Sequence, residues 1–425
     1  MGDRETVKVW SPRKTAAELY KVQPNYQRFN QKYNMTRQGL WEETTFELNK
    51  SRVANLRNLA QAGRTGYNAQ DWAFYLGSRA NISNTGFNIN CPNSPGNSWE
   101  SAFKPTTESS MAVAEQMADR YFNKWQGSPT EASWLLRKMG HHFGADLVGF
   151  CQLDRRWVFS HWFDEESRRD YPIKFSDEPG YEGYSQPTQL EDGTQVIPKE
   201  MQYAVVFIHN MGEDEIAAAP TLSQMAEVMF TYSKIALITT SVAEFIRGLG
   251  YNAIPSANCT ALNVPLAIDA GLGQMGRHVK LINPLFGSRC RISKVITDLP
   301  LAPDKPIDFG VTEFCNQCKK CAEHCPTGAI SFGERCFEPV NECNNGGYLQ
   351  WQVDHKKCYQ YWAEVGTNCG ICLRVCPFSK SSGWVHDVAR WFIKYLKFID
   401  PFFLKMDDAL GYGKYRSSDN LWHKV

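Results

Sequence analysis

Two runs of closely spaced cysteines near the C-terminus limit what this chain can fold into more than any other feature of its sequence. The first run consists of Cys315, Cys318, Cys321 and Cys325, followed by Pro326. The second run consists of Cys369, Cys372 and Cys376, followed by Pro377. Thiolates at these spacings let a short loop wrap a cubane iron–sulfur cluster, while the last cysteine of a run ligates a second cluster. The sequence therefore predicts a unit that holds two [4Fe–4S] clusters.

Crossed ligation divides the cysteines into two sets of four. The first set consists of Cys315, Cys318, Cys321 and Cys376. The second set consists of Cys325, Cys358, Cys369 and Cys372. Cys358 supplies the member that the second run lacks, and Cys336 and Cys343 are alternative donors for its place. Structural zinc and disulfides are the other interpretations, but zinc ligands usually come in paired spacing rather than in two runs that each end in Cys-Pro.

Length and composition restrict the class of protein to which the rest of the chain can belong. It has 425 residues, of which 43% are hydrophobic, so two or three packed domains are feasible. Lysine and arginine number 46 against 45 aspartates and glutamates, which disfavours nucleic acid as a partner bound through charge. No apolar segment approaches the ~18 residues of a membrane span. The first residues also lack the apolar core of a signal peptide.

Hydrophobic patterns predict the elements of a core that precedes the cysteine runs. Strands are expected over 147–151, 203–209, 251–254 and 291–296, and helices over 109–125, 131–143 and 223–247. This alternation indicates an α/β core over roughly 145–300. Residues 152–200 are rich in charged, proline and aromatic residues and are expected to be an insertion, and 81–98 is expected to be a loop.

Four regions follow from these patterns. We expect an N-terminal region over 1–130, a core domain over 131–305, a cluster domain over 306–383 and a C-terminal tail over 384–425. The tail mixes aromatic and basic side chains over 384–405. Such a stretch either packs on the core or faces a membrane or a membrane partner.

Two stretches before the cysteine runs carry a family resemblance. Ala-Gly-Leu-Gly-Gln-Met-Gly-Arg over 270–277 leads to Arg-Ile-Ser-Lys-Val-Ile-Thr-Asp-Leu-Pro over 291–300. With the paired cysteine runs and the distant Cys358, they resemble the corrinoid- and iron–sulfur-dependent respiratory reductive dehalogenases over nearly the whole chain. The length also looks like that of the shorter members, in the mature form without a signal peptide, which reduce chlorinated alkanes such as chloroform and trichloroethane.

The resemblance implies a fold, cofactors and site residues. The fold would be α+β or α/β, with a nitroreductase-like corrinoid-binding core and a C-terminal two-cluster domain like that of bacterial ferredoxins. The core would bury a base-off cobamide of the cobalamin type, without a protein histidine as ligand. Tyr232, Asn258 and Arg291, separated by 26 and 33 residues, resemble the family's catalytic set. Tyr232 would donate a proton, Arg291 would stabilise the phenolate by its charge, Asn258 would line the pocket, and Trp362 would form a pocket wall.

The three catalytic candidates also have ordinary structural interpretations. Tyr232 lies on the apolar side of its predicted helix and could simply pack in the core. Asn258 could form an Asx turn. Arg291 could be a structural or surface side chain.

A glycine-rich block carries a weaker signal. Gly271, Gly273 and Gly276 match a dinucleotide fingerprint, but the segment before them lacks the clear strand that the fingerprint needs. We expect these glycines and Arg277 to contact the corrinoid tail or to permit close backbone packing. The insertion over 152–200 would narrow the access of substrate.

The resemblance predicts an oxidoreductase that replaces a carbon-bound halogen, chlorine on a small alkane, by hydrogen. It would be the terminal reductase of organohalide respiration, and both clusters would relay electrons from an external donor to the cobamide. A small membrane anchor protein would hold it peripherally on the outer face of the cytoplasmic membrane. Export would use a twin-arginine signal that this chain lacks. The oligomeric state is left open.

Three alternatives accompany this prediction. The substrate could be a chlorinated ethene rather than an alkane. The chain could be a cytosolic corrinoid and iron–sulfur reductase similar to epoxyqueuosine reductase, which the balanced charge and the Tyr232, Asn258 and Arg291 set disfavour. It could also be a ferredoxin-type electron carrier, which the ~300 residues outside the cluster domain disfavour because two clusters need only a small fold.

Overall fold

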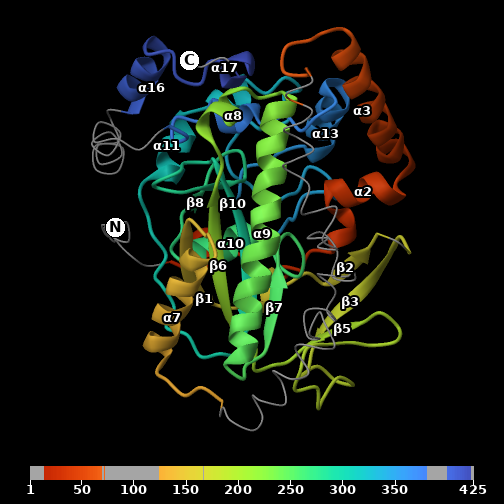
Figure 1. Cartoon of the computed structure of the whole chain (residues 1–425), viewed down its shortest axis with the longest axis vertical. Coiled ribbons are helices and arrows are strands. Elements are labelled where there is room, and N and C mark those ends of the chain that lie inside the picture. The colour runs from red at the N-terminus through yellow and green to blue at the C-terminus, as the bar shows by residue number, and fades with distance from the viewer. Residues whose placement is uncertain (1–13, 69–70, 72–123, 166, 381–399, 423–425) are drawn as a thin grey trace.

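The computed structural model describes residues 14–68, 71, 124–165, 167–380 and 400–422. The predicted loop over 81–98, most of the predicted helix over 109–125 and most of the aromatic stretch over 384–405 lie outside these residues. Figure 1 shows the core sheet in the lower part of the molecule and the short C-terminal helices at the top.

A four-stranded sheet in the order β1-β6-β10-β7 forms the centre of the core. Its strands are β1 (Leu147–Gln152), β6 (Tyr203–Asn210), β7 (Ala253–Ser256) and β10 (Cys290–Thr297). The sequence predicts each of them to within two residues at either end. All neighbouring strands pair antiparallel, so the core is α+β. The expected alternation is present, but β10 lies between β6 and β7 and separates these two parallel strands.

Side chains on the two faces of the sheet enter two different hydrophobic clusters. On β6, Val205 and Phe207 belong to one cluster, whereas Ala204, Val206 and Ile208 belong to the other. This assignment follows from the alternation of side chains along a strand. Both faces are buried, which explains why the strands have nearly continuous apolar sequences.

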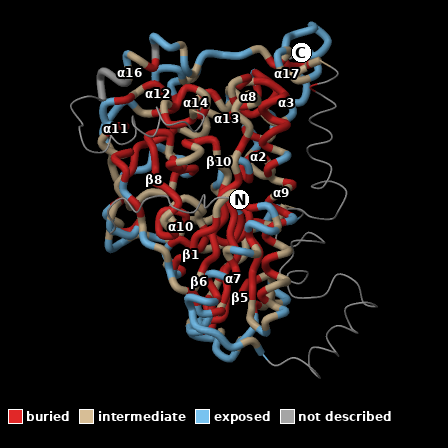
Figure 2. The backbone as a smooth tube through the Cα atoms, turned by 60° about the vertical axis from the view of Figure 1, so that its left-hand side comes forward, coloured by how far each residue is buried: buried red, intermediate tan, exposed pale blue. Residues whose placement is uncertain are grey.

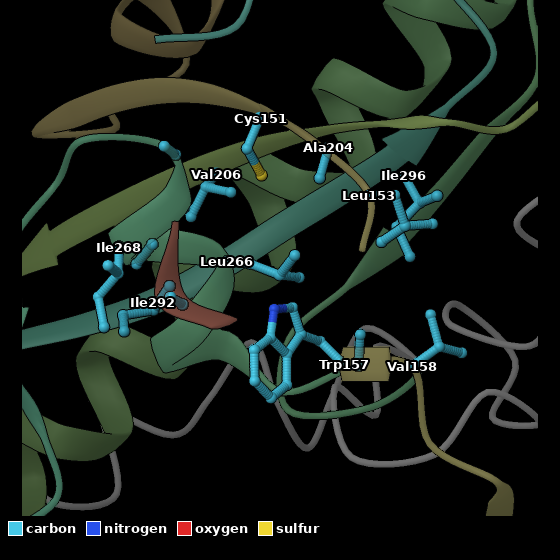
Figure 3. Packing of buried hydrophobic residues seen from close by; sticks show 14 of the residues in the cluster. Cys151, Leu153, Trp157, Val158, Ala204, Val206, Leu266, Ile268, Ile292 and Ile296 are labelled. Atoms are coloured by element: carbon cyan, nitrogen blue, oxygen red, sulfur yellow. The ribbon is translucent and has the colours of Figure 1, made fainter. Parts of the chain in front are cut away.

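Helices cover both faces of the sheet. One face packs against α7 (Pro129–His142) and α9 (Leu222–Gly248), which lies along the strands in Figure 1. The other face packs against α10 (Asn263–Asp269) and, beyond it, α1 (Ala16–Leu19). Figure 3 shows this second face, where Trp157 and Leu266 pack near Ile292.

The long helix α9 is bounded by clear signals at both ends. Thr221 caps its N-terminus by accepting a hydrogen bond from the Gln224 amide. At the other end Gly250 adopts a φ of +87°, which favours glycine and ends the helix. The sequence predicts this helix over 223–247. It carries Tyr232 along its length and holds that side chain on a rigid element.

The segment 152–200 folds into a small sheet of its own in the order β2-β3-β5-β4. It begins with the short helix η2 (Arg155–Trp157), and its strands are β2 (His161–Asp164), β3 (Arg169–Phe175), β4 (Thr188–Gln189) and β5 (Gln195–Ile197). Trp157 and Trp162 are each only 1% exposed. Buried aromatic side chains therefore order this insertion and attach it to the core.

Short helices carry the cysteine runs and surround them. The run-bearing elements are α11 (Val311–Gln317), α12 (Lys320–Glu323), α13 (His355–Val365) and α14 (Ile371–Arg374). The remaining elements are η1 (Gln31–Tyr33), α2 (Met35–Trp41), α3 (Glu43–Gln61), α8 (Glu213–Ala217), β8 (Gln274–Met275), β9 (Leu281–Ile282), α16 (Asp400–Ala409) and α17 (Asp419–Trp422). Helix α3 packs along α13, and the hairpin β8–β9 lies next to α10 and α11.

Burial is continuous between the core and the cysteine-bearing region. Figure 2 shows buried backbone running from the sheet up to α12 and α14. In the described ranges, the structure contains no helix that combines the length and apolar character needed to cross a membrane.

Candidate active site and iron–sulfur centres

The first predicted cysteine set lines a single cavity. Its lining includes Cys315, Cys318, Cys321 and Cys376. All four are buried. Phe314 and Phe378 stack edge to face beside them, with ring centroids 5.1 Å apart. The structure therefore brings together the four thiols that crossed ligation assigns to one cluster, although Cys376 belongs to the other run.

The second predicted set also converges. Its thiols are close enough to influence one another electrostatically: Cys325, Cys358, Cys369 and Cys372. The alternative donors have other neighbours. Cys336 lies 3.6 Å from the carbonyl oxygen of Glu338, and Cys343 lies 3.6 Å from the sulfur of Met35. These contacts favour Cys358 as the fourth ligand.

Thiol spacing distinguishes a cluster from a single metal ion. Within the described ranges, no three histidine, cysteine or acidic side chains are grouped tightly enough to hold one ion. A zinc ion holds thiolates at about 2.3 Å from one centre, whereas a cubane distributes them over four iron atoms. Burial raises the pKa of the Cys318 thiol to about 12, so coordination to iron is needed to keep this sulfur as a thiolate.

Tyr232, Asn258 and Arg291 meet although they lie far apart in the chain. Asn258 Nδ2 donates to Tyr232 Oη over 2.7 Å, and Arg291 Nη1 donates to the same oxygen over 3.0 Å. The guanidinium carbon of Arg291 also lies 4.9 Å from the centroid of the Tyr232 ring. Helix α9 supplies the tyrosine, β10 supplies the arginine, and the loop after β7 supplies the asparagine. The structure thus groups the three residues that the resemblance singles out.

The hydrogen bonds at Tyr232 determine what its hydroxyl can do. Arginine only donates, and Asn258 presents its amide nitrogen, so the phenol oxygen accepts from both. The hydroxyl hydrogen must then point away from both partners and is available to a third group. If that proton leaves, the phenolate keeps two donors, one of them a cation. The arrangement is therefore suited to general acid chemistry.

A cavity of about 410 Å³ connects this group with the region of the second cysteine set. Asn258 and Arg291 line it, as do Leu373 and His355. Leu373 directly follows Cys372, and Tyr232 and Cys372 pack against the same hydrophobic cluster. Much of the remaining wall is apolar or aromatic: Tyr20, Phe29, Trp157, Phe159, Ile268 and Leu281.

The lining of this cavity fits a large cofactor that has apolar faces and a polar rim. Two buried polar atoms in its wall, Asn344 Oδ1 and Arg291 Nε, have no hydrogen-bond partner in the described chain. A corrin ring carries amide side chains around an apolar macrocycle and could satisfy such atoms. Asn344, Lys280 and the apolar wall would hold it.

His355 is a feature of this cavity that the sequence analysis missed. Burial lowers the pKa of its imidazole to about 4, so the side chain is neutral at neutral pH. It begins α13, three residues before Cys358, and Asp354 caps the same helix. Its position three residues before a predicted cluster cysteine is the sequence feature that could have indicated His355 as a site residue. The absence of a histidine ligand to cobalt stays a prediction.

Trp362 is not brought to this cavity. It lies on α13, and its ring is 5.4 Å from that of Tyr359 and 5.6 Å from the guanidinium carbon of Arg52. Its indole also lies close enough to Cys358 to influence the pKa of that thiol. In the described structure Trp362 therefore lies beside the second cysteine set rather than on the wall of the 410 Å³ cavity.

The glycine-rich block serves packing rather than lining the cavity. A Cβ at Gly271 would lie 2.5 Å from the carbonyl oxygen of Lys305, and one at Gly273 would lie 2.3 Å from that of Ile282. A Cβ at Gly276 would lie 2.6 Å from the Ile282 side chain. None of these glycines lines the 410 Å³ cavity. Close backbone approach accounts for all three without a cofactor contact.

Arg277 also has a role different from the expected one. It is 1% exposed and donates four hydrogen bonds of 2.9–3.0 Å to the carbonyl oxygens of Cys315, Ser331 and Gly333. It lines the small cavity of the first cysteine set. Arg277 therefore fastens the first cluster loop to the core instead of contacting the larger cavity.

Replacing Gly273 with alanine should destabilise the protein by about 1–3 kcal/mol, because the added methyl group meets a backbone oxygen that cannot move freely. Gly248→Ala is the matched control, since a Cβ there meets nothing within 4 Å. Thermal unfolding of both variants measures the difference. A melting temperature of Gly273→Ala equal to that of Gly248→Ala would contradict the packing role.

Comparison with known proteins identifies the same two parts of the chain. The family described as "Reductive dehalogenase subunit" matches residues 46–301, more than half of the chain. The family described as "4Fe-4S double cluster binding domain" matches residues 314–379. The second match contains both cysteine runs and Cys358.

The chain matches only part of each curated relative. Tetrachloroethene reductive dehalogenase from Sulfurospirillum multivorans is 41% identical over 304 residues, which cover 69% of this chain and 59% of that protein. The protein of the same name from Desulfitobacterium hafniense is 39% identical over 282 residues, covering 62% of this chain and 51% of that protein. The chain thus spans a little more than half of the length of these relatives.

A solved structure shares the fold. It is described as a reductive dehalogenase structure that suggests a mechanism for B12-dependent dehalogenation. It superimposes with a TM-score of 0.54 at 27% identity and covers 69% of this chain and 38% of that chain. This match and the double-cluster domain confirm the predicted fold class.

Proposed function

We propose, from the premise that this chain belongs to the reductive dehalogenase family, that it replaces a carbon-bound halogen by hydrogen. The reaction is R–X + 2e⁻ + H⁺ → R–H + X⁻, so it consumes electrons and a proton at one place. The observation that carries the proposal is the Tyr232 oxygen held by Arg291 and Asn258, both of which line a cavity that extends to Leu373, next to Cys372 of the second set.

The described residues would divide the work of this reaction. A base-off cobamide in the cavity would supply the low-potential electrons that break the carbon–halogen bond. The two cysteine sets would hold the clusters that relay electrons from an external donor one at a time. Tyr232 would give its proton to the carbon, while Arg291 and Asn258 would stabilise the phenolate. The apolar wall would exclude water and bind a small apolar substrate.

For the substrate we propose a small chlorinated hydrocarbon. The resemblance in length predicted a chlorinated alkane, whereas both curated relatives above are named for tetrachloroethene. Their names favour the chlorinated-ethene alternative. Both classes are small and apolar and suit the aromatic wall of the cavity, so a direct comparison of the two must decide between them.

Halide release should test the proposed function. The protein would be purified without oxygen, supplied with cobamide and reduced by a low-potential dye. We expect chloride from at least one of tetrachloroethene, trichloroethene, chloroform and 1,1,1-trichloroethane, and the relative rates would rank ethenes against alkanes. A protein with both clusters and a corrinoid that releases no halide would point to an epoxide-reducing relative. Clusters without cobalt would point to an electron carrier.

We further propose a peripheral position on the outer face of the cytoplasmic membrane. A small membrane anchor protein would hold the enzyme there, and a twin-arginine signal on a precursor would direct its export. Fractionation of cells that produce the enzyme naturally would test this. Recovery in the soluble cytoplasmic fraction would contradict it.

A further inference from the structure

A fully buried lysine lies on the same strand as Arg291. Lys294 is 0% exposed, and its ammonium donates to three oxygens: Ala257 O over 3.0 Å, Cys259 O over 2.9 Å and Asn263 Oδ1 over 2.7 Å. All three acceptors are neutral. A buried ammonium that is not paired with a carboxylate is costly and calls for an explanation.

The three acceptors surround Asn258. Ala257 and Cys259 are its two neighbours in the chain, so Lys294 fixes the backbone on both sides of it. The third acceptor, Asn263, touches Asn258 directly, because Asn263 Nδ2 donates to Asn258 Oδ1 over 3.1 Å. Lys294 thus reaches the active-site asparagine through its backbone and through a second amide.

These contacts form a directed chain of hydrogen bonds that ends at Tyr232. An ammonium has donors only, so Asn263 must turn its oxygen toward Lys294. Its amide nitrogen then faces the oxygen of Asn258 at 3.1 Å. The same nitrogen lies within hydrogen-bonding distance of Ala257 O at 2.8 Å and Ile292 O at 3.0 Å, which favour the same direction of the amide. Asn258 in turn must present its nitrogen to Tyr232 Oη. Reversing either amide would place two donors or two acceptors against each other.

We propose that Lys294 and Asn263 are positioning residues that fix the direction of the Asn258 amide, so that Tyr232 receives a donor from it. This inference rests on the proposed function, in which Tyr232 gives up its proton. A reversed Asn258 would place a carbonyl oxygen against the phenol. The hydroxyl hydrogen would then turn toward that oxygen and away from substrate, and the phenolate would lose one of its two donors.

The three acceptors at Lys294 favour its charged form, whereas burial opposes it. Burial lowers the pKa of its amine to about 7. Only the charged form has three N–H groups, and the structure uses all three. Replacing this costly cation with an apolar side chain would leave three oxygens without their donor, which explains why the site contains a lysine.

An isosteric variant changes the donor that faces Asn258, and a double-mutant cycle with Asn258 then separates this role from support of the loop. Asn263→Asp keeps the acceptor for Lys294 and creates an opposite charge beside it, so the buried lysine remains paired. The ionised carboxylate cannot donate to Asn258 Oδ1, nor to the backbone oxygens of Ala257 and Ile292 that accept from the wild-type amide. The matched control is Ser256→Ala, because Ser256 Oγ donates to Cys259 O over 2.6 Å in the same buried loop but takes no part in the directed chain.

A double-mutant cycle on the loaded enzyme tests the proposal. Asn263→Asp should lower kcat for halide release about 10- to 100-fold with little change in KM, because one donor to the phenolate is lost. The same change made in an Asn258→Ala background should have little further effect, since both act through one amide. Ser256→Ala should leave kcat within about twofold of the wild-type value.

A readout that does not depend on turnover completes the experiment. With 3-fluorotyrosine in place of Tyr232, the fluorine resonance reports the hydrogen bonds at the neighbouring phenol oxygen. Asn263→Asp should shift this resonance, and Ser256→Ala should not. Should Asn263→Asp fail to retain clusters and cobamide, Lys294→Met removes the first donor of the chain and enters the same cycle.

The outcomes separate the two levels of the argument. Wild-type enzyme that releases no halide would overturn the proposed function, while the fluorine experiment would still test the directed chain. Active wild type with equal effects of Asn263→Asp and Ser256→Ala would overturn the positioning role. Additive losses in the Asn258→Ala background would overturn it as well, because they would show that Asn263 acts by another route.

Discussion

Replacing Tyr232 with phenylalanine should lower halide release at least about 100-fold while leaving both clusters and the cobamide in place. General acids of this kind contribute about 10²- to 10⁴-fold to a rate, and Tyr232 is the only described phenol that contacts Arg291 and Asn258. The phenylalanine ring keeps the packing on α9 and loses only the oxygen. Iron and cobalt content and halide release, measured on the same preparation, test the expectation.

Tyr348→Phe is the matched control for that experiment. Tyr348 lines the 410 Å³ cavity, and its ring packs edge to face with Trp157 at a centroid distance of 6.0 Å. Its phenol makes no contact with Arg291 among the described interactions. We expect this variant to keep most of the wild-type rate. Equal losses in the two variants would show that the cavity needs its tyrosines for binding and not for proton transfer.

Replacing Cys358 with serine should remove one of the two clusters. The iron content should fall from about eight to about four atoms per chain, because the second set would keep only three thiolates. Electron relay, and with it halide release, should be lost almost completely. Iron analysis and electron paramagnetic resonance of the dithionite-reduced protein measure the number of clusters directly.

Cys336→Ser and Cys343→Ser are the controls for this assignment. Both residues lie close to Cys358 in the sequence, but their sulfurs contact Glu338 and Met35 instead of the second set. Each variant should retain the full iron content. Loss of iron in either one, with normal iron in Cys358→Ser, would transfer the fourth position to that cysteine.

The sequence was informative wherever a local pattern determines the structure. The strands over 147–151 and 203–209 are nearly continuous apolar runs, and buried sheets require such runs. Both cysteine sets converge because short spacings and a cluster leave the backbone little freedom. For Tyr232, Asn258 and Arg291 the spacing match to a family supplied the grouping, and periodicity alone would have placed Tyr232 in the core.

Other features depend on which strands and loops become neighbours in the fold, and the sequence alone does not show this. In the sequence, Lys294 looks like an ordinary charged residue of a strand. Its contacts with the loop after β7 follow from the position of β10 between β6 and β7. The direction of the Asn263 amide likewise follows from three-dimensional contacts. Trp362 was assigned to the pocket by resemblance, but the structure places it beside the second cysteine set. For the glycine-rich block, contact with the corrinoid tail and close backbone packing were both expected, and the close approach to Lys305 and Ile282 favours packing.

Arg277 has a mechanical consequence for electron flow. Its four hydrogen bonds to carbonyl oxygens join the segment after β8 to the loop of Cys315 in a site that water does not reach. Separating the two parts would leave a buried guanidinium and three carbonyls unsatisfied at once. A hinge motion at this point would therefore be costly. In the proposed enzyme, this attachment would keep the length of the electron path between the Cys315 segment and the core constant.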